Sequence, residues 1–372
     1  MKLALIHDHL TQEGGAEKVL KVFHDIYPKA PTYTLFYDKK KMSKVFEGKD
    51  IRTSFLQNWP GALKHYQWFL PFMPTATESY DLMDYDVVIS SSSAMSKGVI
   101  TRSNTLHFCY CHTPTRYLWS DTHRYIDELK YNRLIKRFIP PVLTKLRAWD
   151  QLAAQRVDFF IANSKNVADR IQKYYRRDSI IIHPPVATNQ FKISDKIENY
   201  YLTGGRLVAY KRFDIAIQAF NRLGIPLKIF GSGPELNNLK RLAKSNIEFL
   251  DRVSQDELAK LYSRATAFVH PQIEDFGITA VESMAAGRPV IAYAAGGACE
   301  TVVDKKTGKF FDEQTWEALA DAIVRFKPED FKPEEVKNYA QQFSEERFKK
   351  EITNLVEAEW EKLKSTQIKC GI

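Results

Sequence analysis

Short apolar runs alternate with helical patterns along the whole chain, and this order constrains the fold more than any other feature. Residues 3–6 form an apolar run, and apolar side chains then recur at helical spacing over residues 19–26. The same order restarts in the second half, where residues 227–230 and 289–292 are apolar runs followed by helical patterns. Strands that alternate with helices form parallel sheets with helices on both faces. The sequence therefore predicts an α/β fold with two doubly wound domains.

The length of the chain also favours two domains, because 372 residues exceed what one hydrophobic core usually holds. Two consecutive prolines, Pro184 and Pro185, interrupt both helix and sheet and mark the boundary. We expect an N-terminal domain over 1–184 and a C-terminal domain over 185–344. A helix over about 345–372, with apolar residues at i, i+4 spacing, is expected to pack back on the first domain.

Composition indicates the cellular compartment of the protein. No run of about 18 apolar residues is present, and the apolar run at residues 3–6 is too short for a signal peptide, so we expect a cytoplasmic protein. Four cysteines show no disulfide or zinc spacing. Cys109 and Cys111 are expected to face opposite sides of a strand.

The net charge of +9 favours an anionic partner, which could be nucleic acid, a membrane surface or a phosphorylated ligand. Residues 124–156 hold eight Lys or Arg against three Asp or Glu. Such a basic amphipathic stretch can lie on an anionic membrane, and a solvated helix face explains it equally well. An aromatic-rich segment precedes it: Trp59, Tyr66, Trp68, Phe69 and Phe72. Such a density of rings can form an exposed apolar surface, but we expect these rings to pack in the core.

The sharpest local pattern is a pair of glutamates eight residues apart. Glu274 follows a predicted strand, at the edge of the sheet where ligands bind in open α/β folds. Phe276, Gly277 and Ile278 then open a helix whose first N–H groups lack helical partners. Glu282 lies eight residues after Glu274 and is expected about two turns into that helix. Two carboxylates so placed can bracket a polyol, one at a sugar ring and one at a ribose diol.

At these residues the chain resembles the family 4 retaining glycosyltransferases. Glu274 and Glu282 match the E-x7-E motif of that family, and residues 287–292 (G-R-P-V-I-A) fit its continuation. Within the family, residues 7–9, 13–17 and 110–119 are most similar to bacterial mannosyltransferases of O-antigen and exopolysaccharide assembly. The resemblance implies the GT-B fold, in which two Rossmann-like doubly wound domains face each other across a cleft.

Two basic residues after a strand end suit a diphosphate. Arg206 can fork onto two oxygens, and Lys211 can act as a point charge. A surface basic cluster would look the same in isolation. The resemblance assigns the donor diphosphate, and its stabilisation as leaving group, to these two positions.

Glycines mark two further strand-to-helix turns. Gly14 and Gly15 follow the first strand, where a missing Cβ lets the backbone approach a phosphate, although any such turn can use a glycine pair. Gly231 and Gly233 hold a similar place in the second half. The resemblance sets that pair near the donor nucleotide.

A histidine and an arginine lie just beyond a buried strand of the first half. The His112 imidazole can donate a hydrogen bond to a sugar hydroxyl or to developing charge, and a structural histidine is the alternative. The resemblance matches His112 to the cleft histidine of the family. Arg116 could meet an acceptor phosphate.

The predicted function is transfer of mannose from GDP-mannose to a lipid-linked glycan in bacterial surface polysaccharide (lipopolysaccharide) biosynthesis. His112, Arg206, Lys211 and Glu274 are the expected catalytic residues. The departing diphosphate is stabilised electrostatically, without a protein nucleophile. We expect no cofactor and no metal requirement besides the nucleotide-sugar co-substrate. Residues 124–156 would hold the enzyme at the inner face of the cell membrane.

Several alternatives stay open. A UDP-sugar-dependent transferase has the same fold, and a sugar-nucleotide epimerase can share it without using an acceptor. An NAD enzyme is disfavoured because no G-x-G-x-x-G follows the first strand. A non-enzymatic nucleic-acid binder, which would use the positive charge and show steep salt dependence, is disfavoured, and we expect no nucleic-acid partner.

Overall fold

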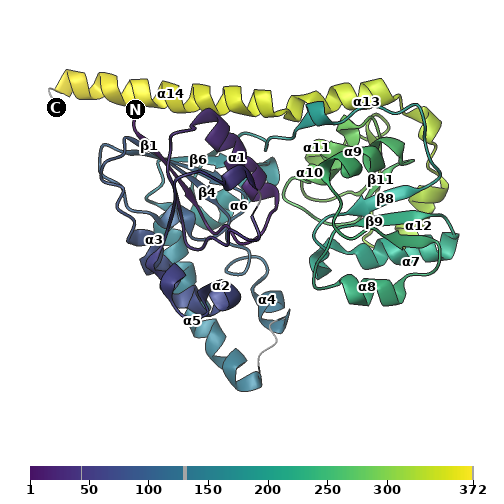
Figure 1. Ribbon diagram of the computed structural model, residues 1–372, viewed down its shortest axis with the longest axis horizontal. Coiled ribbons are helices and arrows are strands. Elements are labelled where there is room, and N and C mark those ends of the chain that lie inside the picture. The colour runs from purple at the N-terminus through teal and green to yellow at the C-terminus, as the bar shows by residue number, and fades with distance from the viewer. Residues whose placement is uncertain (43, 129–131, 371–372) are drawn as a thin grey trace. The chain divides into compact units, whose positions relative to one another are not determined.

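The computed structural model describes residues 1–42, 44–128 and 132–370. These form two compact units (Figure 1). Unit 1 comprises Met1–His183 with Lys349–Ile372, and unit 2 comprises Pro184–Phe348.

Unit 1 is built on a parallel sheet in which seven strands are described, in the order β3-β2-β1-β4-β5-β6-β7. The strand order reverses beside β1, whose neighbours β2 and β4 lie on opposite sides of it. The strands are β1 (Leu3–His7), β2 (Thr32–Thr34), β3 (Ile51–Thr53), β4 (Val87–Ser92), β5 (Leu106–Cys111), β6 (Phe159–Ala162) and β7 (Ser179–Ile181).

Helices connect these strands and cover the sheet (Figure 1). They are α1 (Gly15–Ile26), α2 (Ala62–His65), α3 (Met73–Glu78), α4 (Thr122–Glu128), α5 (Arg133–Ala154) and α6 (Lys165–Tyr175), with the 3-10 turns η1 (Lys44–Phe46), η2 (Phe55–Asn58), η3 (Tyr66–Phe72) and η4 (Ser96–Gly98). Ser164 caps the N-terminus of α6, because its hydroxyl accepts the Val167 N–H.

Unit 2 repeats this plan with a parallel sheet of six described strands, in the order β10-β9-β8-β11-β12-β13. Here the order reverses at β8, which lies between β9 and β11. The strands are β8 (Tyr201–Gly204), β9 (Leu227–Phe230), β10 (Ile247–Phe249), β11 (Phe268–His270), β12 (Val290–Tyr293) and β13 (Gly308–Phe311).

The helices of unit 2 follow the same alternation. They are α7 (Phe213–Leu223), α8 (Leu236–Leu242), α9 (Gln255–Arg264), α10 (Ile278–Ala285), α11 (Ala298–Thr301), α12 (Trp316–Val324) and α13 (Pro333–Ala340), with η5 (Thr188–Gln190), η6 (Ala209–Lys211), η7 (Pro328–Asp330) and η8 (Gln341–Phe343). The long helix α14 (Glu345–Cys370) begins in unit 2, and most of it belongs to unit 1.

Both faces of the unit 2 sheet are buried, as the strand periodicity requires. Successive residues of β11, Phe268 and Val269, belong to different apolar clusters, and so do Val290 and Ile291 of β12. Side chains of a strand alternate between faces, so each cluster fills the space between the sheet and one layer of helices. The doubly wound α/β architecture predicted for this half is confirmed.

Two local expectations were wrong. Cys109 and Cys111 are buried in one and the same apolar cluster, because residues two apart on a strand share a face. The aromatic segment is only partly core: Tyr66 and Phe69 pack against an apolar cluster, whereas Trp59, Trp68 and Phe72 are exposed.

The C-terminal helix buries the apolar stripe that its sequence predicts, since Phe348, Ile352 and Val356 are inaccessible to solvent. Lys349 forms an ion pair with Asp25 of α1, with Nζ and Oδ2 3.2 Å apart. None of the described helices, α14 included, combines the length and the apolar character needed to cross a bilayer.

Candidate functional site

The candidate site of unit 2 lies at the carboxyl ends of β8 and β11, where the strand order reverses. Lys211 ends the turn η6 after β8, and Glu274 lies in the loop after β11. Their Nζ and Oε1 atoms are 2.7 Å apart, and both side chains are largely buried. Burial lowers the pKa of Lys211, but the adjacent Glu274 carboxylate and Tyr210 together outweigh it, so that pKa lies above its ordinary value. A charged pair therefore occupies the place where doubly wound sheets bind ligands.

Glycines make room for this pair. A Cβ on Gly205, whose φ is +128°, would lie 3.3 Å from the Lys211 ammonium. A Cβ on Gly231 would lie 1.9 Å from the Gly205 carbonyl oxygen, and one on Gly233 would lie 2.2 Å from that of Leu207. Backbone packing alone therefore requires the two glycines expected near the nucleotide, and their contact with a ligand stays a prediction.

The loop after Glu274 opens α10 as predicted. Gly277 is its N-terminal cap in the left-handed conformation, and Ile278 is the first helical residue. The Gly297 N–H donates to the Glu274 carbonyl at 2.8 Å, and a Cβ on Gly297 would lie 2.4 Å from the Phe276 Cα. These two contacts with Gly297 fix the loop that joins Glu274 of the ion pair to the N-terminus of α10.

Glu282 lies little more than one turn into α10, closer to the helix start than the two turns expected from its spacing. It is 4% exposed, and its Oε2 accepts a hydrogen bond from the Tyr262 hydroxyl at 3.1 Å. Tyr262, a residue of α9 that the sequence analysis passed over, thereby orients this carboxylate.

His270 is a second residue of this region that the sequence analysis missed. It ends β11 and is inaccessible to solvent, and within the described residues neither ring nitrogen has a hydrogen-bond partner. Burial lowers the pKa of His270 to about 4; the Glu274 carboxylate acts against this, and the Lys211 ammonium acts in the same direction as burial. A Cβ on Gly277 would lie 3.4 Å from the His270 Nε2. Its place at a strand end, four residues before Glu274, was the available signal.

The other predicted cation of unit 2 is not part of the pair. Arg206 is exposed in the segment between β8 and η6, whereas Lys211 is enclosed. Only Lys211 is therefore held in place by a neighbouring carboxylate within this site.

In unit 1 a chain of polar groups joins β1, β4 and β5. The His112 Nε2 lies 2.8 Å from the Ser91 Oγ, and the same hydroxyl lies 3.1 Å from the His7 Nδ1. The His7 Nε2 lies 3.5 Å from the Glu17 Oε1. Burial lowers the pKa of His112 to about 4, and the neighbouring His7 acts in the same direction. His112 is thus a neutral imidazole held by a hydroxyl.

Gly14 caps α1, and a Cβ there would lie 3.1 Å from the Glu17 Oε2. A carboxylate therefore lies beside the turn that was expected to face a phosphate, and its charge opposes an anion next to Gly14 and Gly15. Arg116 lies partly exposed in the turn after β5.

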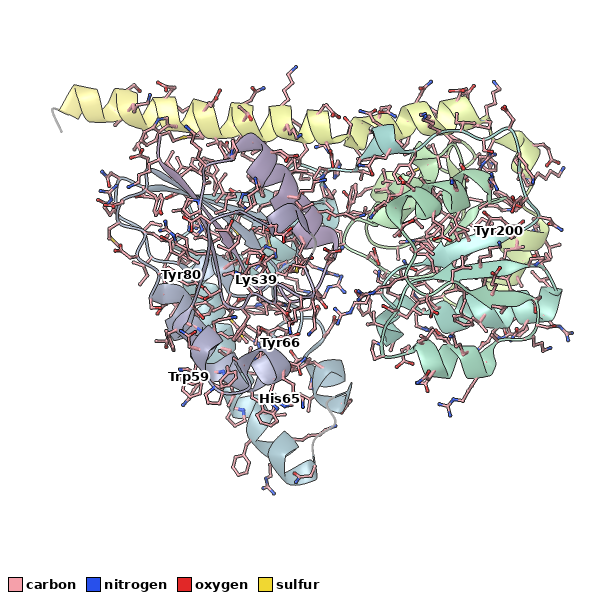
Figure 2. All side chains as sticks on the ribbon, in the orientation of Figure 1. Lys39, Trp59, His65, Tyr66, Tyr80 and Tyr200 are labelled. Carbon is pink, nitrogen blue, oxygen red and sulfur yellow. The ribbon has the colours of Figure 1, made fainter. Side chains whose placement is uncertain are left out.

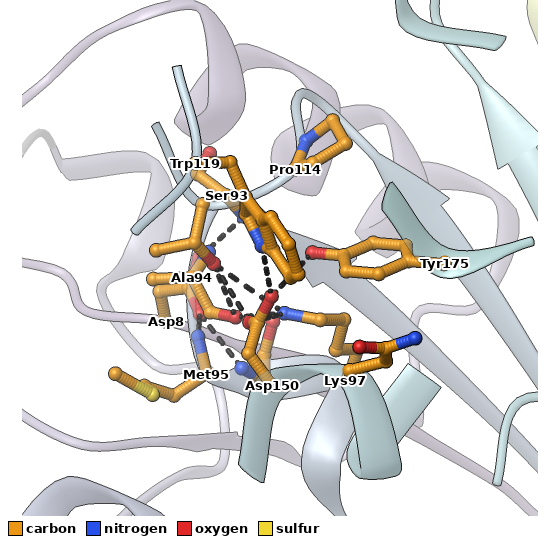
Figure 3. A network of polar contacts seen from close by, with 12 residues as sticks. Asp8, Ser93, Ala94, Met95, Lys97, Pro114, Trp119, Asp150 and Tyr175 are labelled. Atoms are coloured by element: carbon orange, nitrogen blue, oxygen red, sulfur yellow. Dashed lines mark hydrogen bonds and ion pairs between the residues drawn. The ribbon is translucent and has the colours of Figure 1, made fainter. Parts of the chain in front are cut away.

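Two buried networks support these loops (Figure 3). The Asp8 carboxylate, directly after β1, accepts four backbone N–H groups of residues 93–96 at 2.6–2.9 Å. Asp150 of α5 pairs with Lys97 and accepts hydrogen bonds from Trp119 and Tyr175. Each buried carboxylate is fully partnered, so the segments that follow β1, β4 and β5 are mutually fixed.

No group of three or more His, Cys, Asp or Glu side chains with metal-binding geometry occurs in the described parts of the chain. The triplet Asp84-Tyr85-Asp86 has D-x-D spacing, but it precedes β4 and therefore lies at the opposite end of that strand from His112 and Ser91. There Asp84 pairs with Lys2 at 3.4 Å.

Two family models match the chain. Residues 30–190 match the family described as Glycosyltransferase Family 4, and residues 187–343 match Glycosyl transferases group 1. The first match covers most of unit 1, and the second covers nearly all of unit 2.

Curated relatives match over part of their length. The chain is 30% identical over 200 residues to a D-inositol 3-phosphate glycosyltransferase of Mycobacteroides abscessus, covering 47% of this chain and 45% of that protein. It is 35% identical over 137 residues to a GDP-mannose-dependent alpha-(1-6)-phosphatidylinositol monomannoside mannosyltransferase of Mycobacterium tuberculosis, covering 32% and 36%. The chain thus spans less than half the length of these two relatives.

A solved structure extends the likeness over the whole fold. The Anabaena protein Alr3699/HepE, in complex with UDP and glucose, is similar with a TM-score of 0.71 at 19% identity, covering 96% of this chain and 99% of that chain. The predicted GT-B fold is confirmed by this likeness and by the two doubly wound sheets. Residues 30–343 thus match two glycosyltransferase families in succession, one over most of unit 1 and one over nearly all of unit 2, on a GT-B fold.

Proposed function

We propose that the chain transfers a sugar from a nucleotide-sugar donor with retention of anomeric configuration, and that unit 2 binds the donor. One observation carries the proposal: Lys211 and Glu274 form an enclosed ion pair where the strand order of the unit 2 sheet reverses. At this place the cation can bind the charged diphosphate of a sugar nucleotide, and the carboxylate can accept hydrogen bonds from the sugar hydroxyl groups.

Each residue of the proposed donor site has one task. Lys211 and Arg206 neutralise the diphosphate and stabilise it as it leaves. Glu274 accepts hydrogen bonds from the sugar, and the backbone of Phe276, Gly277 and Ile278 at the start of α10 donates to it. Because Glu274 already pairs with Lys211 at 2.7 Å, donor binding is proposed to compete with that pair. Glu282, held by Tyr262, is proposed to accept from the ribose.

Unit 1 is proposed to bind the acceptor. His112, neutral because burial depresses its pKa to about 4, can donate a hydrogen bond to a sugar hydroxyl or to developing charge. Arg116 is proposed to meet an acceptor phosphate. Gly14 and Gly15 are proposed to approach the donor, with Glu17 able to accept from a hydroxyl beside them.

The proposed donor is GDP-mannose, and the proposed acceptor is a lipid-linked glycan at the inner face of the cell membrane. In support, one relative is named as GDP-mannose-dependent and as acting on a phosphatidylinositol monomannoside. The basic residues of 124–156 are proposed to favour an anionic membrane, although 129–131 lie outside the described residues. Surface polysaccharide assembly is the proposed setting.

A UDP-sugar is the second candidate donor. The Anabaena structure with a TM-score of 0.71 holds UDP and glucose, and its fold matches both units of this chain. The residues proposed to hold the diphosphate and the sugar would keep their tasks, because they do not contact the base.

A thermal-shift panel of GDP-, UDP-, ADP- and dTDP-sugars, without added metal, tests the proposal. A ligand at about 100 times its Kd stabilises the native state by about 2.7 kcal/mol. We expect a shift with GDP-mannose that Lys211→Met abolishes, whereas Lys309→Met, an exchange elsewhere in unit 2, keeps it. A shift with a UDP-sugar alone would overturn the donor, and no shift with any sugar nucleotide would overturn the donor site itself.

A further inference from the structure

Four large aromatic side chains are exposed on one short segment of unit 1. Phe55, Trp59, Trp68 and Phe72 are 41%, 37%, 61% and 50% exposed, and we call them the aromatic patch. The Trp59 ring lies 5.8 Å from that of Phe55 and 5.4 Å from that of Phe72. Trp68 stacks on His65 with 4.4 Å between ring centroids. Figure 2 shows Trp59, His65 and Tyr66 in this part of the unit.

The patch is unusual within the chain. Among the residues that the structure describes, the exposed Phe, Trp and Tyr side chains are the aromatic patch and Phe138 of α5, which is 73% exposed. The exposed apolar residues of unit 2, such as Leu242 and Val324, are aliphatic. Clustered exposed aromatic rings mark an interaction surface, because leaving them in water is unfavourable.

One lobe carries both Phe138 and the aromatic patch. Leu56 of η2 and Met73 of α3 share a buried apolar cluster with Leu143 and Leu146 of α5. In Figure 1, α2, α3 and α5 lie together. We call this part of unit 1, formed by residues 55–78 and α5, the helical lobe.

The exposed charge on the helical lobe has one sign. The single carboxylate of residues 55–78 is Glu78, which is partly buried and paired with Arg156 at 2.6 Å, and Lys64, between Trp59 and Trp68 in the sequence, is exposed. On α5, Arg137 and Lys145 are exposed, whereas the single carboxylate of that helix, Asp150, is inaccessible and paired with Lys97. Aromatic rings beside uncompensated cations are typical of surfaces that bind anionic bilayers.

We propose that the helical lobe docks unit 1 on an anionic lipid bilayer. The aromatic patch and Phe138 enter the boundary between headgroups and acyl chains, and Lys64, Arg137 and Lys145 bind lipid phosphates. A second copy of the chain fits less well, because it would bring the cations of two lobes together. The inference rests on the proposed function, since a lipid-linked acceptor is reached from a membrane surface.

Vesicle flotation of the full chain tests the aromatic contribution. We expect the protein to float with vesicles of phosphatidylglycerol and phosphatidylethanolamine, and to float less with phosphatidylcholine alone or at high salt. The double variant Trp68→Ala/Phe72→Ala should lower the partition coefficient by about tenfold or more. The matched control Leu242→Ala/Val324→Ala, which removes exposed apolar side chains from unit 2, should float like the wild type.

A charge-reversal pair tests the cations. Arg137→Glu/Lys145→Glu should weaken flotation with anionic vesicles, whereas Lys244→Glu/Lys327→Glu, an equal charge change on exposed residues of unit 2, should have much less effect. Equal losses of flotation in the two double variants would mean that net charge alone explains the effect, and would overturn the proposed docking surface.

Other outcomes also decide the matter. Wild-type protein that stays unbound on anionic vesicles, or an aromatic double variant that floats normally, would overturn the inference. A dimer in light scattering that the same double variant converts to monomer, with unchanged flotation, would assign the patch to self-association. The donor thermal shift separates the two proposals: a normal shift without vesicle binding removes only the docking surface, and vesicle binding without any donor shift removes only the proposed function.

Discussion

Lys211 and Glu274 neutralise each other at 2.7 Å in a largely buried place, so a ligand that binds either charge competes with the other for it. A diphosphate can do this, because it brings more than one negative charge to the ammonium. The freed carboxylate then needs donors, and the hydroxyl groups of a sugar supply them. The ion pair therefore makes the binding of charge and the binding of sugar interdependent.

Exchange of the cation should show this dependence. We expect Lys211→Met to lower turnover by about 10²–10³-fold, because leaving-group stabilisation is lost and Glu274 keeps an unpaired charge. Initial rates with a saturating donor, beside a circular dichroism spectrum that reports folding, measure the effect. Turnover within a factor of about two of the wild type would remove Lys211 from the leaving-group role.

The contribution of the Glu282 carboxylate to donor binding can be separated from that of Tyr262, which orients it. Glu282→Ala should weaken donor binding by about tenfold, since a buried acceptor for the ribose is lost. Tyr262→Phe keeps the carboxylate and removes only the hydroxyl 3.1 Å away, so a smaller loss is expected. Calorimetric titration of the nucleotide sugar compares the two variants. An unchanged Kd for Glu282→Ala would exclude the ribose role.

At the scale of elements, the turns after β8 and β9 depend on each other through glycine. A Cβ on Gly231 would lie 1.9 Å from the Gly205 carbonyl oxygen, which is backbone and cannot rotate away. The candidate site therefore requires both turns to keep their conformation, because Gly205 also leaves room for Lys211.

Two alanine variants isolate this requirement. Gly231→Ala should reduce the free energy of unfolding of unit 2 by about 3 kcal/mol or more through the clash. Gly224→Ala has a similarly positive φ of +70° with no atom within 4 Å, so it should cost about 1–2 kcal/mol from backbone conformation alone. Urea unfolding measures both. Equal losses would mean that the turn adjusts and the close approach is not essential.

The sequence predicted what periodicity and turn chemistry encode. The strands, the Ser164 cap and the loop that opens α10 at Gly277 follow from local patterns. The pairing of Lys211 with Glu274 did not, because it joins residues 63 positions apart through the neighbouring places of β8 and β11. His270 was missed because its significance lies in lacking partners, which only a packed interior reveals.

The prediction that the aromatic segment packs in the core was wrong for another reason. Trp68 and Phe72 are apolar enough for a core, but a 3-10 helix turns its side chains to several sides, and only the side with Tyr66, Phe69 and Leu70 packs against the apolar cluster. The hydrophobicity of a ring favours its burial, but it does not determine whether the core of the protein or another surface buries the ring.

At the scale of the whole molecule, buried histidines should make stability depend on pH. Burial lowers the pKa of His107 to about 3 and the pKa of His24 and His112 to about 4, from an ordinary value of 6.5. A lowered folded-state pKa means that the unfolded chain binds protons first. The contribution is therefore complete above pH 6.5 and is lost as the pH falls toward the folded values, with a slope of up to about 1.4 kcal/mol per pH unit for each histidine.

All three of these histidines belong to unit 1, whereas unit 2 holds His270, whose pKa is likewise lowered to about 4, so unit 1 should lose more stability than unit 2 on mild acidification. Urea titrations at pH 7.5 and 5.5 test this, and His107→Gln should flatten the dependence while the exposed His123→Gln leaves it unchanged. A free energy of unfolding that is constant over this range would contradict the assignment.

The chain enters unit 2 at Pro184 and leaves it at Phe348, and just inside these points Val186 and Ser344 form a parallel bridge, with the Val186 N–H donating to Phe343 at 2.9 Å. Unit 2 is thus an uninterrupted insert whose two ends are tied to each other by its own backbone. Because this bridge already holds the two ends of unit 2 together, cutting the unit out of the chain adds little to the entropic cost of closing it. Residues 184–348 should therefore fold as a separate fragment, and new termini cut into one of its surface loops should be tolerated once the old ends are joined.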